Sequence, residues 1–251
     1  MSIAESTAHA EHTDHPASAA QCVPSRGEQD FRRARIAPYR MPGAECLQRN
    51  KVDWGLRARD AVLVLHDMQN FWLDFYQQPE PLIRALRQLR DLCDVIGVPV
   101  VMTSAQRPQH PAERGLSRDL WGPGIGGADY HARDTQFVQA LQMRPHDHHI
   151  VKEKYSAFFN TPLQDVLART GRRQIVLCGV FAHHGVMLTA ADAFMRNYQV
   201  FMPVDGVADY CLDDHLLAVN YVAQMCGKIM LLADVEQALR ADARTYVKGS
   251  E

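Results

Sequence analysis

Short apolar runs alternate with helical segments along the whole chain, and this alternation constrains the fold more than any other feature. The apolar runs have the length and composition of buried strands and cover residues 61–66, 98–103, 150–151, 175–178, 200–204 and 228–232. Helical spacing is found in residues 79–95, 162–170, 188–195 and 214–226. Repeated strand–helix alternation predicts a parallel sheet with helices on both faces. We therefore expect a three-layer α/β/α fold.

Composition narrows the class of protein. The chain has 251 residues and a formal net charge of −2, without a long basic or acidic run, so nucleic-acid and membrane-surface binding gain no electrostatic support. We predict a mobile tail over residues 1–37, which lack the apolar core of a signal peptide, and a single domain over residues 38–251. Six cysteines without a C-x-x-C pair predict reduced thiols and a cytoplasmic protein.

Three polar features follow the carboxyl ends of predicted strands. Asp67 follows the first strand, Lys152 the third, and the glycine-bounded turn 179–185 the fourth. Because these ends share one edge of a parallel sheet, a carboxylate, an ammonium group and backbone N–H groups are expected to converge there, where such folds bind ligands. Two structural alternatives stay open: Asp67 as a turn cap, and Lys152 as a solvated surface charge.

One segment between strands has the character of a functional loop. Residues 104–130 contain many Pro, Gly, Arg and aromatic residues but no strong helix or strand pattern. Loops of this length in compact domains are typical of lids and binding loops. We expect this segment to contribute to a binding site.

Six sequence blocks resemble the isochorismatase branch of the isochorismatase-like hydrolases. They are HDMQ at 66–69, AQ at 105–106, RGL…DLWGPG within 114–124, KEKYSAF at 152–158, GVFAHHGVM at 179–187 and DAFMR at 192–196. The blocks occur in the family's order, and the similarity runs from about residue 50 to residue 234. The resemblance implies a Rossmann-like sheet of six parallel strands and a hydrolase that releases pyruvate from an enolpyruvyl (vinyl) ether.

The resemblance also implies the chemistry. Related amidases use an Asp–Lys–Cys triad, and this chain has Gly185 where their cysteine falls. A vinyl ether is broken by protonating its terminal carbon, which requires a general acid but no nucleophile, metal or cofactor. Asp67 is the candidate acid. The ammonium of Lys152 should lower the pKa of that carboxyl group, and we expect the substrate's own carboxylate to take up the lysine charge on binding.

Further substrate-binding residues are carried over from the family. They are Gln106, Arg114, Trp121, Tyr155, Phe71, Phe181 and Gly185. Gln106 and Arg114 would hold polar and carboxylate groups, and Gly185 would leave space for the substrate; for each aromatic residue a plain core role is the alternative. The family carries a cis peptide that we place between Val180 and Phe181. Glu153 and Lys154 replace a usual Trp and Arg, and Phe181 replaces a common Tyr.

Other functions remain open at this point. An amidase of the same fold, and a catalytically silent binding protein, are the alternatives to a vinyl-ether hydrolase. Twelve histidines suggest a metal, but adjacent histidines such as His183 and His184 would point to opposite faces of a strand, so no metal is expected. We expect no carrier domain, because the C-terminal region after the last predicted strand is short. This favours the amino substrate of phenazine pathways slightly over the isochorismate of siderophore pathways. A homodimer or larger homo-oligomer is expected, as in related proteins.

Overall fold

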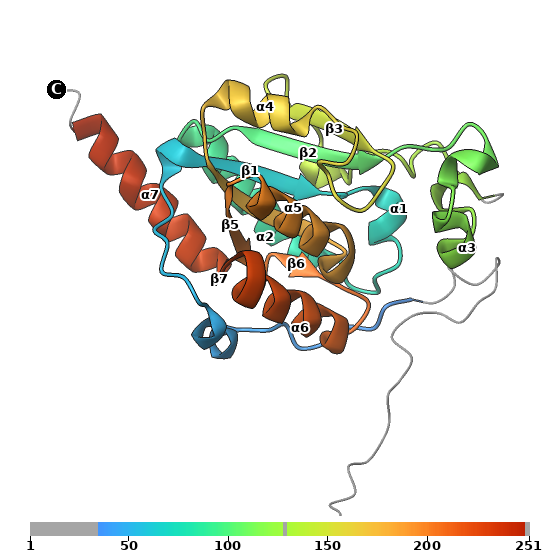
Figure 1. Ribbon diagram of the computed structural model, residues 1–251, viewed down its shortest axis with the longest axis horizontal. Helices are drawn as coiled ribbons and strands as arrows, with labels where there is room; N and C mark the ends of the chain where they lie inside the picture. The colour runs from blue at the N-terminus through green and yellow to red at the C-terminus, as the bar shows by residue number, and fades with distance from the viewer. Residues whose placement is uncertain (1–34, 128–129, 249–251) are drawn as a thin grey trace, which may run out of the picture.

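A parallel β sheet lies at the centre of the protein, as a computed structural model of residues 35–127 and 130–248 shows (Figure 1). Its strands are β1 Ala61–His66, β2 Val100–Ala105, β3 His148–Lys152, β4 Gln174–Val180, β5 Gln199–Pro203, β6 Val207–Ala208 and β7 Gly227–Met230. The order is β3-β2-β1-β4-β5-β7, with β6 pairing β4, and all pairs are parallel. The expected fold class is confirmed, with the two-residue β6 as a seventh strand.

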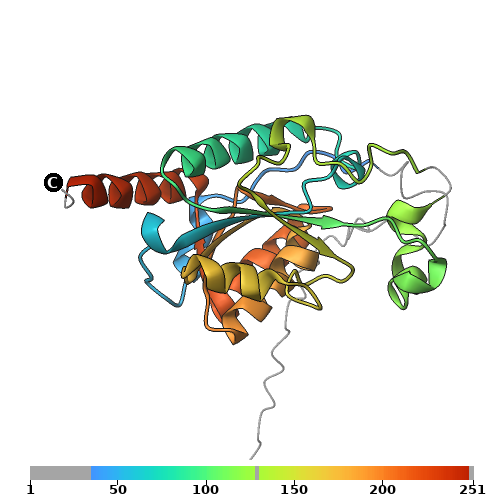
Figure 2. The same ribbon diagram turned by 90° about the horizontal axis from the view of Figure 1, so that it is seen from above.

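Helices cover both faces of this sheet (Figure 2). The α-helices are α1 Asn70–Leu73, α2 Glu80–Val95, α3 Ser117–Trp121, α4 Leu163–Thr170, α5 Met187–Met195, α6 Leu212–Tyr221 and α7 Leu232–Lys248. Figure 2 shows α2 and α7 on one face and α4, α5 and α6 on the other. Short 3-10 helices are Ala44–Arg49, Ala58–Asp60, Pro111–Arg114, Gly124–Gly126 and Gln139–Leu141, and π-helical turns are Ala182–Val186 and Val222–Cys226.

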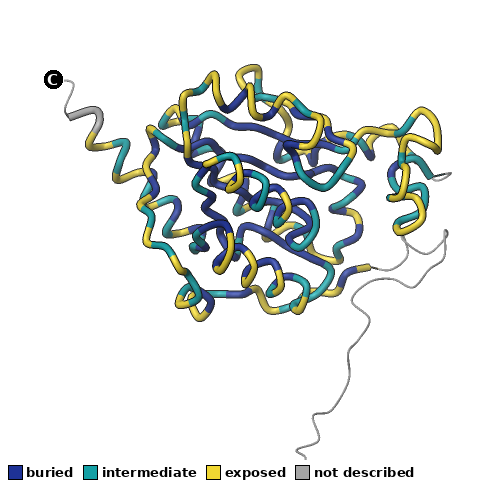
Figure 3. Tube along the Cα trace, in the orientation of Figure 1, coloured by how far each residue is buried: buried dark blue, intermediate teal, exposed yellow. Residues whose placement is uncertain are grey.

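The strand β1 shows how sequence periodicity builds two cores. All six of its residues are buried (Figure 3). Leu63 and Leu65 pack into the core under α2 and α7, whereas Val62 and Val64 pack into the core under α4, α5 and α6. Successive side chains of a strand point to opposite faces, so a continuous apolar run is required where both faces are covered.

The helix α2 follows its predicted apolar stripe. Leu82, Leu86, Leu89 and Cys93 are all buried against the sheet. Burial of each leucine side chain contributes about 1.5–3 kcal/mol to the stability of the folded protein. Gly97 adopts a left-handed conformation with φ 70° just beyond the helix, which allows the chain to turn into β2.

The helix α7 is the largest element that the sequence analysis does not predict. It is seventeen residues long, and Val235 and Leu239, four positions apart, are fully buried. Its first residues follow β7 almost directly, so the apolar end of the strand and the start of the helix form one continuous run in the sequence. None of the helices in the described part of the chain has the length and apolar character needed to cross a bilayer.

An N-terminal arm joins the sheet edge where the site lies. Ile36 pairs with Tyr76 although it falls inside the predicted tail, whose residues 1–34 lie outside the described residues. The Tyr39 hydroxyl accepts a hydrogen bond from the Asp209 N–H and contacts His215 Nδ1 at 3.0 Å. His215 Nε2 lies 2.9 Å from the Val204 carbonyl and must donate to it, so Nδ1 accepts the Tyr39 proton.

The cysteines differ from the expectation of uniformly reduced thiols. Free thiols are found at Cys46, Cys93, Cys178 and Cys226, all of them buried. Cys211 is disulfide-bonded, so the expectation is wrong there. Cys22 lies outside the described residues.

Candidate active site

Asp67 and Lys152 meet at the carboxyl edge of the sheet. Asp67 follows β1, Lys152 ends β3, and β2 lies between the two strands. Asp67 Oδ2 and Lys152 Nζ are 2.7 Å apart, and both residues are buried, with 6% and 7% of their surface exposed. An ion pair with so little solvent contact is weakly screened. The alternatives of a simple turn cap for Asp67 and a solvated charge for Lys152 do not describe this arrangement.

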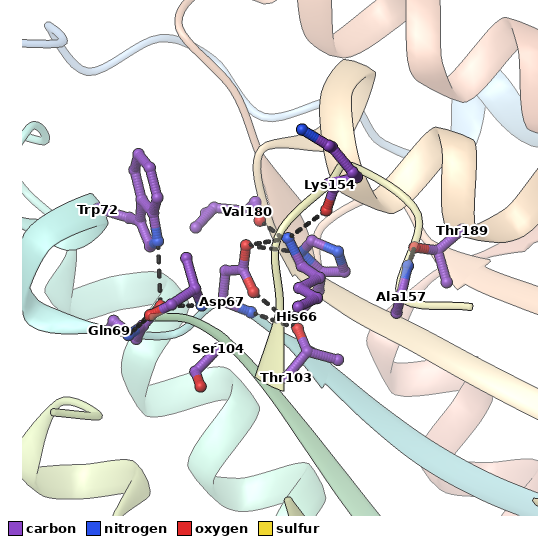
Figure 4. Close-up of polar contacts among 12 residues, drawn as sticks. His66, Asp67, Gln69, Trp72, Thr103, Ser104, Lys154, Ala157, Val180 and Thr189 are labelled. Carbon is purple, nitrogen blue, oxygen red and sulfur yellow. Dashed lines mark hydrogen bonds and ion pairs between the residues drawn. The ribbon is translucent and has the colours of Figure 1, made fainter. Parts of the chain in front are cut away.

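The backbone and Thr103 fix the direction of the Asp67 carboxylate (Figure 4). Asp67 adopts a φ of 51°, an uncommon conformation for a residue with a side chain. Its N–H lies 3.2 Å from the Thr103 carbonyl and 3.1 Å from the Thr103 hydroxyl oxygen. The hydroxyl in turn donates to Asp67 Oδ1 at 2.7 Å. The remaining oxygen, Oδ2, is directed to Lys152.

These neighbours set the protonation state of Asp67. Burial raises the pKa of Asp67, but the His66 and Lys152 charges and the hydrogen bonds outweigh burial, so the net pKa is lowered. Burial lowers the pKa of His66 to about 4, so that imidazole is neutral at neutral pH. We therefore assign the net lowering at neutral pH to Lys152 and to the hydrogen bond from Thr103. In the unliganded site Asp67 is a carboxylate.

The imidazole of His66 fills the space beside Gly185. A Cβ atom at Gly185 would lie 2.1 Å from His66 Cε1 and 2.6 Å from His66 Nε2. The expectation that Gly185 leaves space for the substrate is therefore wrong, because a protein side chain already occupies that space. Gly179 is required for a similar reason, since its Cβ would meet the His66 carbonyl oxygen at 2.2 Å.

The turn after β4 is a π-helix that begins just beyond a cis peptide. The bond between Val180 and Phe181 is cis, as the family resemblance implies. Residues Ala182–Val186 then wind as a π-helical turn, so His183 and His184 have ring centroids 3.9 Å apart. The expectation that these two rings point to opposite faces of a strand is wrong.

His184 lies inside a group of aromatic rings. Its ring centroid is 4.7 Å from Trp121, 5.5 Å from Tyr155 and 5.5 Å from Tyr210. Phe181 stacks on Tyr210 at 4.4 Å. Burial, and then the neighbouring His183, lower the pKa of His184 to about 4. The group therefore offers an uncharged, flat-walled surface next to the charged pair.

Trp121 and Tyr155 join the long segment to this wall. Trp121 Nε1 donates to the Tyr155 hydroxyl at 2.5 Å. Ser156 donates to Asp192 Oδ2 at 2.7 Å, and Thr189 Oγ1 accepts the Ala157 N–H at 2.9 Å, so α5 fixes the loop that carries Tyr155. Phe71 instead packs with Trp72 and Phe75 in the core, in line with the core role left open for it.

Gln106 and Arg114 do not reach the charged pair. Gln106 is exposed and lies 3.4 Å from Glu153 Oε1. The Arg114 guanidinium donates to the carbonyls of Gly122 and Ser117, both within its own segment. Lys154 Nζ donates to the Arg114 carbonyl at 3.4 Å. The segment that carries Arg114 and α3 projects from the carboxyl edge of the sheet (Figures 1 and 2).

Two groups of side chains in the described ranges bring three potential metal-ligand atoms together. In the group Asp94, His146 and Asp147, the carboxylates already pair with Arg144 and Arg90. The other group is His183, Asp209 and Asp214, where Asp209 accepts hydrogen bonds from the His183 N–H and ring Nδ1. Burial lowers the pKa of His183, but Asp209 outweighs it and raises the pKa. An ion-paired histidine is a poor metal ligand, because a metal needs the neutral imidazole.

Sequence reasoning did not assign roles to Thr103, His66, His184 and Tyr210. Thr103 ends the predicted second strand, and its carbonyl accepts the Asp67 N–H, so extending the parallel register of the two strands could have identified it. The contact of His66 with Gly185, and of His184 with Tyr210, depends on the π-helical turn and on chain segments far apart in sequence. No local pattern signals those contacts.

Several known proteins are similar to this chain in sequence or in fold. The sequence model described as Isochorismatase domain matches residues 61–234. Enterobactin synthase component B of Escherichia coli (strain K12) is 35% identical over 205 residues, covering 80% of this chain and 71% of that protein. Phenazine biosynthesis protein PhzD of Pseudomonas fluorescens is 35% identical over 208 residues, covering 80% and 96%.

A solved structure agrees with the fold. The crystal structure of a cysteine hydrolase from Pseudomonas syringae pv. phaseolicola 1448A superposes with a TM-score of 0.71 at 21% identity, covering 76% of this chain and 97% of that one. The family match spans the strands, the Asp67–Lys152 pair and the π-helical turn described above. The chain therefore belongs to the isochorismatase family of hydrolases.

Proposed function

We propose that this enzyme hydrolyses the enolpyruvyl ether of isochorismate or of 2-amino-2-deoxyisochorismate, releasing pyruvate. The single observation that carries the proposal is the buried Asp67–Lys152 pair, held 2.7 Å apart beside a glycine at position 185. The site thus offers a carboxyl group and a cation but no nucleophile at the π-helical turn. That combination suits acid chemistry better than acyl transfer.

Asp67 is the proposed general acid. Its carboxyl group would give a proton to the terminal methylene carbon of the vinyl ether, forming an oxocarbenium ion. Water then adds to the cationic carbon, and the hemiketal collapses to pyruvate and the ring alcohol. Thr103 and the backbone hold the carboxyl group, so proton transfer requires no rearrangement of the acid.

Lys152 is proposed to change partners when substrate binds. In the unliganded site its ammonium holds the pKa of Asp67 down and keeps it ionised. A substrate carboxylate next to Lys152 would neutralise that charge, and the nearby negative charge would favour the protonated form of Asp67. Substrate binding itself would then produce the acid that the reaction needs.

The ring of the substrate is proposed to lie against the aromatic group around His184. Trp121, Tyr155 and Phe181 supply flat apolar surfaces there. Gln106 and Arg114 would contact the polar ends of the substrate only after the projecting segment moves toward Lys152. A guanidinium fork suits a carboxylate, which favours this role for Arg114.

Pyruvate formation tests the proposal directly. The purified protein is incubated with isochorismate and with 2-amino-2-deoxyisochorismate in parallel, and pyruvate is followed with lactate dehydrogenase and NADH. Turnover with either substrate supports a vinyl-ether hydrolase, and the ratio of the two kcat/KM values assigns the substrate. Absence of pyruvate with both substrates contradicts the proposal and leaves the amidase and binding-protein alternatives.

The cellular context is part of the proposal. We propose that the reaction belongs to a secondary-metabolite pathway, because two relatives are named for enterobactin and phenazine synthesis. We propose a cytoplasmic enzyme, because four of its cysteines are free thiols, although Cys211 is disulfide-bonded. Fractionation of the producing cells tests that location.

A homodimer or larger homo-oligomer is also proposed. Phe194 and Met195 on α5 are 46% and 73% exposed, and Leu217 on α6 and Met225 beyond it are 50% and 58% exposed. Both helices cover the same face of the sheet (Figure 2), and these four exposed apolar side chains define the proposed contact face. Light scattering of the protein and of Met195→Glu tests whether a second copy covers that face.

A further inference from the structure

His66 and Gly185 share one volume next to the charged pair. Position 66 ends β1, and position 185 lies in the π-helical turn after β4. A Cβ atom at position 185 would approach three atoms of the imidazole, at 2.1, 2.6 and 3.1 Å. Real side chains do not tolerate the first two distances, so a side chain larger than hydrogen at 185 requires His66 to move.

The ring of His66 has no freedom to move aside. It is 1% exposed, and its Nδ1 lies 2.9 Å from the Val180 carbonyl, to which it must donate. That bond fixes the neutral tautomer with a lone pair on Nε2, in agreement with the lowered pKa of the ring. Nε2 is buried and has no hydrogen-bond partner in the described part of the chain. A buried acceptor left unpaired is costly.

The shared volume lies within reach of the reacting groups. His66 Nδ1 is 3.6 Å from Asp67 Oδ2, the oxygen that pairs with Lys152. A side chain at position 185 would therefore lie one ring away from the acid and the ammonium. A thiol at that place would have the cationic neighbour that lowers a cysteine pKa and activates it.

We propose that His66 is a positioning residue that sets the class of reaction at this site. Its imidazole takes the volume that a side chain at position 185 would need, and so excludes a nucleophile and leaves Asp67 as the acting group. The catalytic meaning of this inference rests on the proposed function. The exchange of volume between the two positions does not, and it can be measured without substrate.

Replacement of His66 by asparagine gives a matched background for the test. The asparagine amide can donate to the Val180 carbonyl from about the place of Nδ1, while the ring atoms at 2.1 and 2.6 Å disappear. In the wild-type background, Gly185→Ala is expected to lower Tm by about 5 °C or more through overpacking. In the His66→Asn background, the same change is expected to lower Tm by less than about half as much.

A cysteine then tests the chemistry of the vacated space. In the double variant His66→Asn with Gly185→Cys, the new thiolate is expected to attack the carbonyl carbon of p-nitrophenyl acetate. The ester C–O bond breaks, p-nitrophenolate leaves and the acetyl group stays on sulfur as a thioester. We expect a burst of one p-nitrophenolate per chain and a thiol alkylated by iodoacetamide with an apparent pKa below the ordinary value of about 8.5. Wild-type protein, which holds every other cysteine, is the control and should show neither.

Each result decides the inference. Equal losses of Tm from Gly185→Ala in both backgrounds overturn it, as does a folded double variant without a burst and with an ordinary thiol pKa. A double variant that fails to fold leaves the decision to the alanine series, which requires no thiol. Failure of the proposed function would instead be seen as absence of pyruvate from the wild-type protein and would change none of these measurements.

Discussion

The floor of the site and the projecting segment above it are built in opposite ways. Asp67, Thr103 and Lys152 are buried at the ends of three neighbouring strands, and their hydrogen bonds join different strands. Arg114, in contrast, lies in a largely exposed segment and bonds to carbonyls of that same segment. The floor is ordered by the sheet, whereas the segment is held to the site chiefly by aromatic contacts and a few polar contacts. If the proposed function holds, the acid would be in place before substrate binds, and recognition would be completed afterwards.

Replacement of the acid should give the largest effect. Asp67→Asn keeps the size of the side chain but removes the transferable proton, and we expect kcat to fall on the order of 10³-fold. Pyruvate release measures this loss, and Asp119→Asn in the projecting segment is the control. An Asp67→Asn variant that keeps the parental kcat would show that the floor does not supply the acid.

Removal of the cation should act on both binding and pH dependence. Lys152→Met is expected to raise KM by about 10- to 150-fold, since one charge-assisted hydrogen bond to the substrate is lost. Because Asp67 is active when protonated and its pKa is lowered in the wild type, kcat/KM should fall as pH rises above that pKa. Without Lys152 the pKa of Asp67 rises, so this fall should begin at a higher pH. A fall that moves to lower pH, or does not move, would contradict the assignment.

The arginine of the segment tests the second half of the comparison. Arg114→Ala should raise KM about 10-fold and change kcat less, because the residue joins the site only with substrate present. Arg118→Ala, in the same segment, is the matched control. A 10-fold loss of kcat at unchanged KM would contradict this role and would assign Arg114 to the preformed floor instead.

Paired tryptophan substitutions should give the smallest effects and separate the two regions. Trp72 Nε1 donates to Gln69 in the floor, and Trp121 Nε1 donates to Tyr155 below the segment. Losing one such bond costs about 0.5–1.5 kcal/mol. We expect Trp72→Phe to lower Tm with little change in KM, and Trp121→Phe to raise KM a few-fold with little change in Tm. Thermal melts and initial rates are measured on the same preparations of both variants. Equal changes of Tm and KM in the two variants would contradict the distinction between the two regions.

The sequence predicts the Asp67–Lys152 pair of the floor because its determinants are local. The apolar run 61–66 has to be a central strand, and Asp67 and Lys152 directly follow strands, so their meeting follows from the sheet. The helix α7 and the strand β6 were missed for local reasons too: β6 has two residues, and α7 follows β7 almost without a break.

The rest of the site depends on contacts that no local pattern encodes. Gly185 suggests empty space when it is considered alone, but His66, 119 positions earlier, fills that space. His183 and His184 suggest opposite directions on a strand, but a π-helical turn brings their rings together. Arg114 matches the family pattern in sequence, yet its position depends on how the segment packs.

The hydroxyl of Tyr39 connects the N-terminal arm to Asp209 and His215 through hydrogen bonds. Each hydrogen bond in this chain has a defined donor. The Asp209 N–H donates to the Tyr39 hydroxyl, Tyr39 donates to His215 Nδ1, and His215 Nε2 donates to the Val204 carbonyl. Asp209 also pairs with His183 in the π-helical turn. A truncated enzyme that begins after Tyr39 would leave the Asp209 N–H and His215 Nδ1 without this hydrogen-bond partner. Asp209 would then be held less firmly against His183. An active truncated form therefore has to begin before Tyr39.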